Sequence, residues 1–122
     1  MTKGKLKPVL PSLREKKRYL VYEVVSDKKI KDFKNVNEAI ICASLDFQGI
    51  SGTARSGILN LENKWNSSLQ RGILKTGHKS VDNVKASLNF IKEIEGNEAI
   101  VRSIGISGIL KKAESKFIKN NN

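Results

Sequence analysis

Hydrophobic side chains in the first half of the chain follow two periods, one typical of a strand and one typical of a helix. Residues 17–26, KRYLVYEVVS, are dense in β-branched and aromatic side chains on both faces, which predicts a first strand in the middle of a sheet. Apolar residues then recur at helical spacing from Val36 to Phe47. Asn35 is a plausible N-cap and Gly49 can close a helix in the left-handed conformation, so we expect a helix between them.

Two short apolar runs follow and predict a pair of strands. Residues 53–62 and 69–76 flank the segment ENKWNSS, whose Asn and Ser side chains suit a hairpin loop. Ser80 is then expected to cap a second helix with one apolar stripe from Val81 to Ile91. The segment EGN at 95–97 is expected to end that helix.

The C-terminal part of the chain predicts one more strand and one more helix. Residues 99–106, AIVRSIGI, read as a strand with Ile100, Ile104 and Ile106 on one side. Ser107 is expected to cap a last helix. The inward face of this helix is predicted to consist of Leu110, Ala113 and Phe117.

The order of elements, β-α-β-β-α-β followed by a C-terminal helix, predicts an α+β protein of the ferredoxin-like plan. This plan has a four-stranded antiparallel sheet with two helices on one face, as in RRM-like domains. We expect a single domain over residues 17–119, preceded by a basic arm over 1–16 and followed by a disordered tail over 120–122. Pro8 and Pro11 forbid a continuous helix in the arm.

Electric charge narrows the choice of partner. The chain of 122 residues has 23 lysines and arginines against 12 acids, a formal charge of +11. Both ends are strongly basic, whereas the middle is closer to neutral. A polyanion is therefore the expected partner, and nucleic acid and an anionic membrane surface are the two choices. No run of about 20 apolar residues is present, so we expect RNA rather than a membrane, and a cytoplasmic protein without a secretory signal.

The residues that enzymes use for catalysis are scarce in this chain. It has one cysteine and one histidine, which excludes an internal disulfide and a thiolate or imidazole metal site. Cys42 stands between Ile41 and Ala43 and is predicted to be a buried core thiol rather than a nucleophile. We therefore expect no catalytic residue and no cofactor bound by the protein.

The basic residues next to predicted elements are the candidates for RNA contact. Isolated lysines such as Lys28, Lys29 and Lys92 are more typical of an ordinary solvated surface. His78 and its neighbours stand between a strand and a helix, where backbone N–H groups also favour phosphate, although His78 equally fits a structural surface histidine. The candidate set is Arg14, Lys16, Lys17, Arg18, Lys75, His78, Lys79, Lys111 and Lys112.

The chain lacks the aromatic side chains with which RRM domains stack bases. The third strand, RGILKT, has Ile73 and Leu74 where such residues are needed, and only 6% of the chain is aromatic. We therefore expect recognition of phosphates and of RNA shape. The apolar outer face of the sheet is expected to be exposed and would then suit a protein partner.

Four stretches together resemble the ribonuclease P protein component 2 family of archaea and eukaryotes. They are LPSLREKKRYLVYEV, RSGILNLE, QRGILKTGHKSVDNVKASL and VRSIGISGILKKAESKF, and they span most of the chain. The resemblance implies a ferredoxin-like domain that pairs with protein component 3, as a heterodimer or a heterotetramer, and binds the catalytic domain of the RNase P RNA. Other RNase P protein subunits and precursor tRNA are further implied partners.

The resemblance also implies how the activity is divided. The enzyme removes the 5′ leader of precursor tRNA, and the RNA component with its Mg²⁺ ions performs the hydrolysis. The chain is then part of an enzyme without supplying catalytic residues. Its basic N-terminal region, with Arg14, Lys17 and Arg18, is implied to support the catalytic core and the precursor tRNA.

Two other functions share some of these features. A stand-alone RRM-like RNA-binding protein has the same charge and fold, but binds diverse RNA and needs no component 3. A regulatory domain for a small metabolite has the same fold, but no need of a charge of +11. An intrinsic nuclease requires an acid, base or metal constellation that this sequence does not supply.

Overall fold

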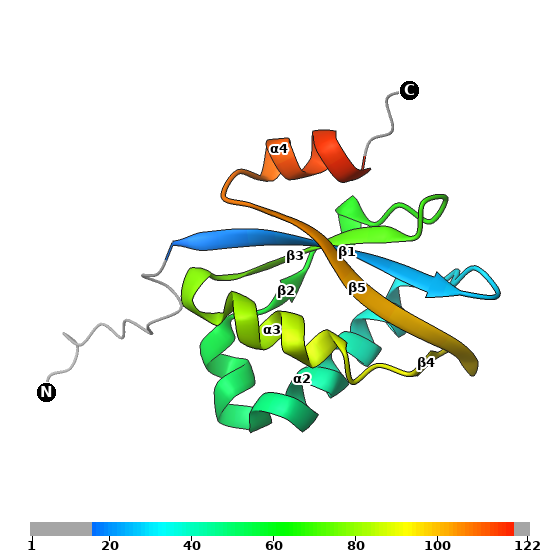
Figure 1. Cartoon of the computed structure of the whole chain (residues 1–122), viewed down its shortest axis with the longest axis horizontal. Coiled ribbons are helices and arrows are strands. Elements are labelled where there is room, and N and C mark those ends of the chain that lie inside the picture. The colour runs from blue at the N-terminus through cyan, green and yellow to red at the C-terminus, as the bar shows by residue number, and fades with distance from the viewer. Residues whose placement is uncertain (1–15, 119–122) are drawn as a thin grey trace, which may run out of the picture.

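The fold is an antiparallel sheet with helices on both faces (Figure 1). A computed structural model describes residues 16–118 of the chain, so the predicted tail and all of the arm except Lys16 lie outside the described residues. The helices and strands are β1 (Lys17–Ser26), α2 (Phe33–Ser56), β2 (Leu59–Asn60), β3 (Arg71–Gly77), α3 (Val81–Leu88), β4 (Glu93–Ile94), β5 (Asn97–Ser107) and α4 (Leu110–Ala113).

The sheet has the strand order β2-β3-β1-β5-β4, with β1 in the middle and every neighbouring pair antiparallel. This confirms the predicted α+β, ferredoxin-like class and the central position of the first strand. The prediction of four strands was wrong by one, because β4 adds a two-residue strand at one edge. Glu95 and Gly96 both have positive φ, 56° and 77°, and form the tight turn between β4 and β5.

The same turn corrects the end of the second helix. The segment EGN was expected to end it, but α3 ends at Leu88 and Ile91 is buried in the connection to β4. Ser80 precedes the helix as predicted, although it makes no capping hydrogen bond through its side chain and belongs to a short 3₁₀ turn, His78–Ser80.

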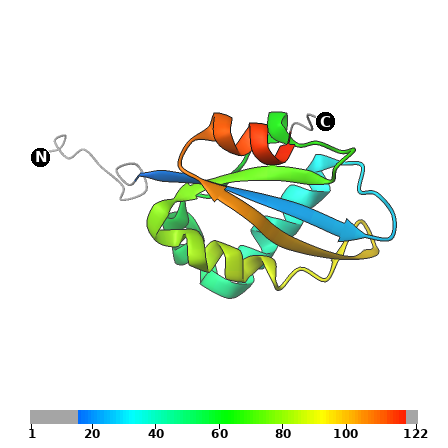
Figure 2. The same cartoon turned by 45° about the horizontal axis from the view of Figure 1, so that its top comes forward.

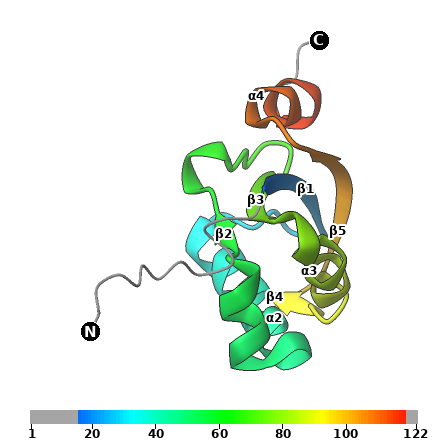
Figure 3. The same cartoon turned by 90° about the vertical axis from the view of Figure 1, so that its left-hand side faces the viewer.

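The two faces of the sheet bury different clusters (Figures 2 and 3). On one face α2 and α3 cover Leu20, Tyr22 and Val24 of β1. On the other face the C-terminal helix covers Val21 and Ile73. We use "C-terminal helix" for residues 110–118, in which α4 continues as a π-helical turn, Glu114–Ile118. The apolar outer face that we expected to be open is thus partly closed by the chain itself.

The first helix is longer than predicted at its C-terminal end. Asp32, not Asn35, caps it, because the Asp32 carboxylate accepts the Lys34 N–H at 3.1 Å. Gly49 is left-handed as expected, with φ 79°, but it makes a kink and not an end. Hydrogen bonds among polar side chains span the kink and hold the helix on both sides of it. They join Ser44 to Thr53, Gln48 to Ser44, and Ser56 to Gln48.

The continuation of α2 removes most of the strand predicted over 53–62. Only Leu59 and Asn60 pair with β3, because the helix runs to Ser56 and is closed by Gly57 with φ 62°. The predicted antiparallel pairing of these two segments is nevertheless confirmed.

The last strand carries a bulge that breaks the predicted alternation. Val21 pairs with Gly105 and Tyr22 with Ser103, so Ile104 is the extra residue. The three isoleucines therefore do not share one face. Ile100 and Ile104 lie on the face of the C-terminal helix, whereas Ile106 lies opposite Leu20, which belongs to the cluster under α2 and α3.

The C-terminal helix is fixed to the sheet at several points. Its predicted inward residues Leu110, Ala113 and Phe117 do pack on the outer cluster. Arg71 Nη1 donates to the Phe117 carbonyl and Asn66 Nδ2 to the Ile118 carbonyl, both at 2.9 Å. Ser107 does not cap this helix directly; its Oγ accepts the Ile109 N–H at 3.0 Å and shapes the turn before it.

The exposure of Cys42 and the length of the helices bear on two further predictions. Cys42 is exposed on α2, so the prediction of a buried thiol was wrong: the helix turns Ala43 inward and leaves its neighbour outside. Among the helices of residues 16–118, none is long and apolar enough to span a bilayer.

Gly105 provides a test of how the C-terminal helix is seated. A Cβ atom at this position would overlap the ring of Phe117, so the ring lies directly on the glycine backbone. We expect Gly105→Ala to lower the free energy of unfolding by about 1–3 kcal/mol through overpacking. Urea unfolding measures this value. Phe117→Leu in the Gly105→Ala background should recover part of the loss. If Gly105→Ala costs as much in the Phe117→Leu background as in the natural protein, this packing is contradicted.

Candidate nucleic-acid interface

Three strands terminate at the same end of the sheet. Antiparallel pairing sets the start of β1 beside the end of β3, with Lys17 opposite Gly77 and Tyr19 opposite Lys75. It also sets the start of β1 beside the end of β5, with Tyr19 opposite Ser107. Residues that are about 60 and 90 positions apart in the sequence therefore meet at one end of the sheet.

This arrangement brings together most of the cations that the sequence singled out. The Lys16 carbonyl accepts the His78 N–H at 2.9 Å, which joins the start of β1 to the 3₁₀ turn after β3. Lys79 follows in that turn and is exposed, as is Lys16. We call this surface the basic end; it consists of Lys16, Lys17, Arg18, Lys75, His78 and Lys79.

The guanidinium of Arg18 is held in place by neighbouring backbone. Its Nη1 donates to the Lys17 carbonyl at 3.1 Å. A Cβ atom on Gly108 would stand 3.4 Å from the same nitrogen, so the guanidinium lies against the turn between β5 and α4. The arginine thus links the basic end to the start of the C-terminal helix.

The remaining candidates lie beyond that turn or outside the described residues. Lys111 and Lys112 are exposed in the first turn of α4, which begins three residues after Ser107. Arg14 lies outside the described residues. His78 is half-buried, and its Nδ1 is buried without a hydrogen-bond partner among the described residues. Its role in RNA contact stays a prediction.

The basic end exposes no aromatic ring among the described residues. Tyr19 is half-buried against the outer cluster. Ile73 lies under the C-terminal helix and Leu74 under the helices of the opposite face, both fully buried. The middle strands therefore offer no platform on which bases could stack. Likewise, no three side chains of His, Cys, Asp or Glu within residues 16–118 gather to hold a metal ion.

An ion-pair network that the sequence did not predict lies across the three central strands of the sheet. Glu23 of β1 lies between Arg71 of β3 and Arg102 of β5, with N–O distances of 3.2 and 2.6 Å. Burial raises the pKa of Glu23, but the hydrogen bonds from Arg102 and Arg71 outweigh it and leave that pKa below its ordinary value. The three residues lie opposite one another only in the observed register of the strands. Their pairing could therefore not be predicted from the sequence of each strand alone.

The comparison with protein families decides which family this is. A family model described as the Rpp14/Pop5 family matches residues 18–118. The chain belongs to the Rpp14/Pop5 family. The match begins at Arg18 of the basic end and runs to the last described residue of the C-terminal helix.

Individual relatives agree with this membership. Ribonuclease P protein component 2 of Pyrococcus furiosus is 35% identical over 92% of this chain and 91% of its own length. The protein of that name from Methanocaldococcus jannaschii is 36% identical over 93% of this chain and 81% of its own length. The one from Thermococcus gammatolerans is 32% identical over 88% of each. The resemblance found in the sequence is thereby confirmed.

Glu23 gives a prediction about pH. A carboxylate whose folded pKa is lowered stabilises the fold above its unfolded pKa, and this contribution is lost as the pH falls through the folded value. We expect the free energy of unfolding to decrease below about pH 4.3, the ordinary pKa of glutamate, and Glu23→Gln to reduce that decrease. Urea unfolding from pH 6 to pH 3, as an approximate range, measures it.

Glu93→Gln is the matched control, since Glu93 is exposed on β4. The free energy of unfolding of the Glu93→Gln variant should change with pH as that of the natural protein does. A Glu23→Gln profile identical to the natural one would contradict the network.

Proposed function

We propose that this protein is a non-catalytic subunit of ribonuclease P and that its basic end binds the RNA component of that enzyme. Membership of the Rpp14/Pop5 family and the names of the relatives support the assignment to the enzyme. The observation that carries the RNA-binding part is the convergence of predicted cations from β1, from β3 and from the turn after β3 on one end of the sheet.

The electrostatics of the basic end suit a phosphate backbone. Lys16, Lys75 and Lys79 form no ion pair within the described residues, and none of the residues that define the basic end is acidic. Such cations contribute little to the stability of the fold, but they can displace counterions from RNA. Without an exposed ring, the basic end is suited to backbone and shape contacts, which do not read sequence directly.

The proposed assembly follows the family resemblance. The chain binds the catalytic domain of the RNase P RNA together with protein component 3, as a heterodimer or heterotetramer, alongside other protein subunits and precursor tRNA. The Mg²⁺ ions are held by the RNA. Arg14 stands two residues before Lys16 in the sequence, and Lys111 and Lys112 follow the turn against which Arg18 lies, so these three residues would extend the contact. Cytoplasmic localisation stays a prediction.

A triple substitution tests the basic end. Replacing Lys16, Lys75 and Lys79 with Ala should weaken binding to the cognate RNase P RNA. Each lost phosphate contact lowers the slope of log K against log salt by roughly 0.7 to 0.9, so the total decrease should be about 2 to 3. Filter binding over a series of salt concentrations measures both affinity and slope.

The matched control removes the same charge at the opposite end of the molecule. Lys28, Lys31 and Lys34 lie between the end of β1 and the first turn of α2, and all three are exposed. Replacing them with Ala should leave the slope nearly unchanged. Equal losses for the two triple variants would mean that net charge, and not the basic end, determines binding. Equally tight binding of unrelated RNA would favour a stand-alone RNA-binding protein.

A further inference from the structure

The edge of the sheet formed by β5 is open at the end of the molecule away from the basic end. On its inner side β5 pairs with β1 from Ala99 to Ser107. On its outer side β4 pairs only with Asn97 and Glu98, and the Ala99 N–H donates to the Lys92 carbonyl at 3.0 Å. Within residues 16–118 no strand pairs with this edge beyond Ala99.

Unpaired backbone groups along this edge can be located from the alternation of the strand. The Ala99 N–H points to the open side, so those of Val101 and Ser103 do so as well. The bulge at Ile104 then ends the regular segment. Within residues 16–118 this short row of donors and acceptors therefore has no partner strand.

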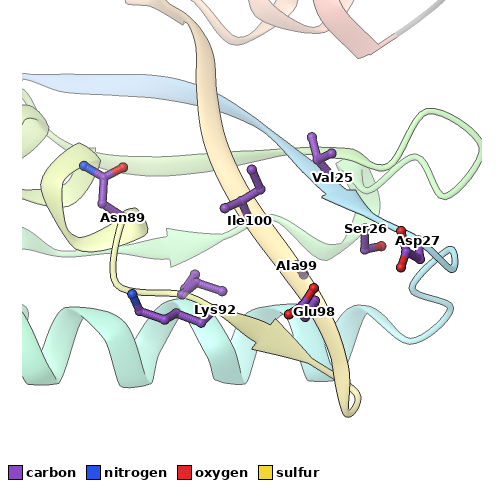
Figure 4. A pocket seen from close by; sticks show the side chains of 9 residues that line it. Val25, Ser26, Asp27, Asn89, Lys92, Glu98, Ala99 and Ile100 are labelled. Carbon is purple, nitrogen blue, oxygen red and sulfur yellow. The ribbon is translucent and has the colours of Figure 1, made fainter.

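Apolar side chains and a hollow accompany the open edge. Val25 and Ile100 are cross-strand partners and remain 42% and 57% exposed. Beside them lies a hollow of about 490 Å³ with Ile91 and Ala99 in its wall. Figure 4 shows it between β5 and the connection from α3 to β4, which contributes Asn89 and Lys92.

The charges around the hollow differ from those of the basic end. Asp27 and Glu98 line it and form no ion pair within the described part of the chain, while Lys92 is its single cationic lining residue. A phosphate backbone would be repelled by the two carboxylates. An apolar peptide segment with a lysine or arginine beside its apolar residue is complementary to them.

We propose that the β5 edge is a docking site for an extended segment of protein component 3, which adds to the sheet as a further strand. The segment pairs with the backbone of Val101 and Ser103, places an apolar side chain against Val25 and Ile100, and sets a basic side chain near Asp27 and Glu98. This inference rests on the proposed function for the identity of the partner. The protein then binds RNA at one end and protein at the other.

A charge placed on the apolar pair tests the site. Ile100→Lys should weaken binding of purified component 3 to the full chain by about tenfold or more, measured by isothermal titration calorimetry. Leu59→Lys is the matched control, because Leu59 is 53% exposed on β2 at the opposite edge of the sheet. It should bind component 3 as the natural protein does. Thermal unfolding of both variants confirms that they are folded.

Hydrogen exchange identifies the mode of binding. The Val101 and Ser103 amides should exchange rapidly in the free protein and slowly in the complex with component 3. Unchanged exchange at these amides, or equal affinities of Ile100→Lys and the natural protein, would overturn the docking site while leaving the proposed function intact. Protection that appears with rising protein concentration in the absence of component 3 would assign the edge to a second copy and overturn it as well.

Failure of the proposed function has a different signature. If the natural protein binds neither component 3 nor the cognate RNA, the assignment to ribonuclease P fails, and the docking site fails with it. If it binds the RNA but not component 3, the docking site and the pairing with component 3 are overturned, while RNA binding by the basic end stands.

Discussion

Burial of β1 on both faces is the constraint on which the rest of the structure depends. Leu20 and Tyr22 lie under α2 and α3, while Val21 lies under the C-terminal helix, and all three side chains are fully buried. A strand in this position must be hydrogen-bonded on both edges, because its buried N–H and C=O groups need partners within the protein. The pairing with β3 and β5 follows, and with it the place where each of these strands ends.

That pairing separates the molecule into two ends of different character. Lysines and arginines of β1 and β3 meet where β1 begins, and the turn after β5 brings the start of the C-terminal helix to the same place. Where β1 ends, Val25 and Ile100 are exposed beside two carboxylates and an open strand edge. Between the two, Glu23 joins the three central strands through Arg71 and Arg102. Such a separation suits a subunit that binds RNA and protein at once.

Much of this could be predicted from local patterns, because β1, the inward stripes of the helices and the basic clusters are each encoded by contiguous residues. The predictions were wrong where tertiary contacts determine the local structure. Gly49 ends a helix in isolation, but the hydrogen bonds of Ser44 and Gln48 carry α2 past it. The pair Glu95 and Gly96 is equally compatible with the end of a helix and with a hairpin turn. The bulge at Ile104 cannot be predicted without knowledge of the partner strand. The Glu23 network required the register, which no single segment contains.

The central claim is that this chain acts in ribonuclease P by binding the RNA together with a second protein. Cleavage of a precursor tRNA by the cognate RNase P RNA at limiting Mg²⁺, with this protein and component 3 added singly and together, tests it most directly. We expect cleavage at the 5′ leader only when both proteins are present. Cleavage that is unchanged by this protein, alongside its equally tight binding to unrelated RNA, would contradict the claim.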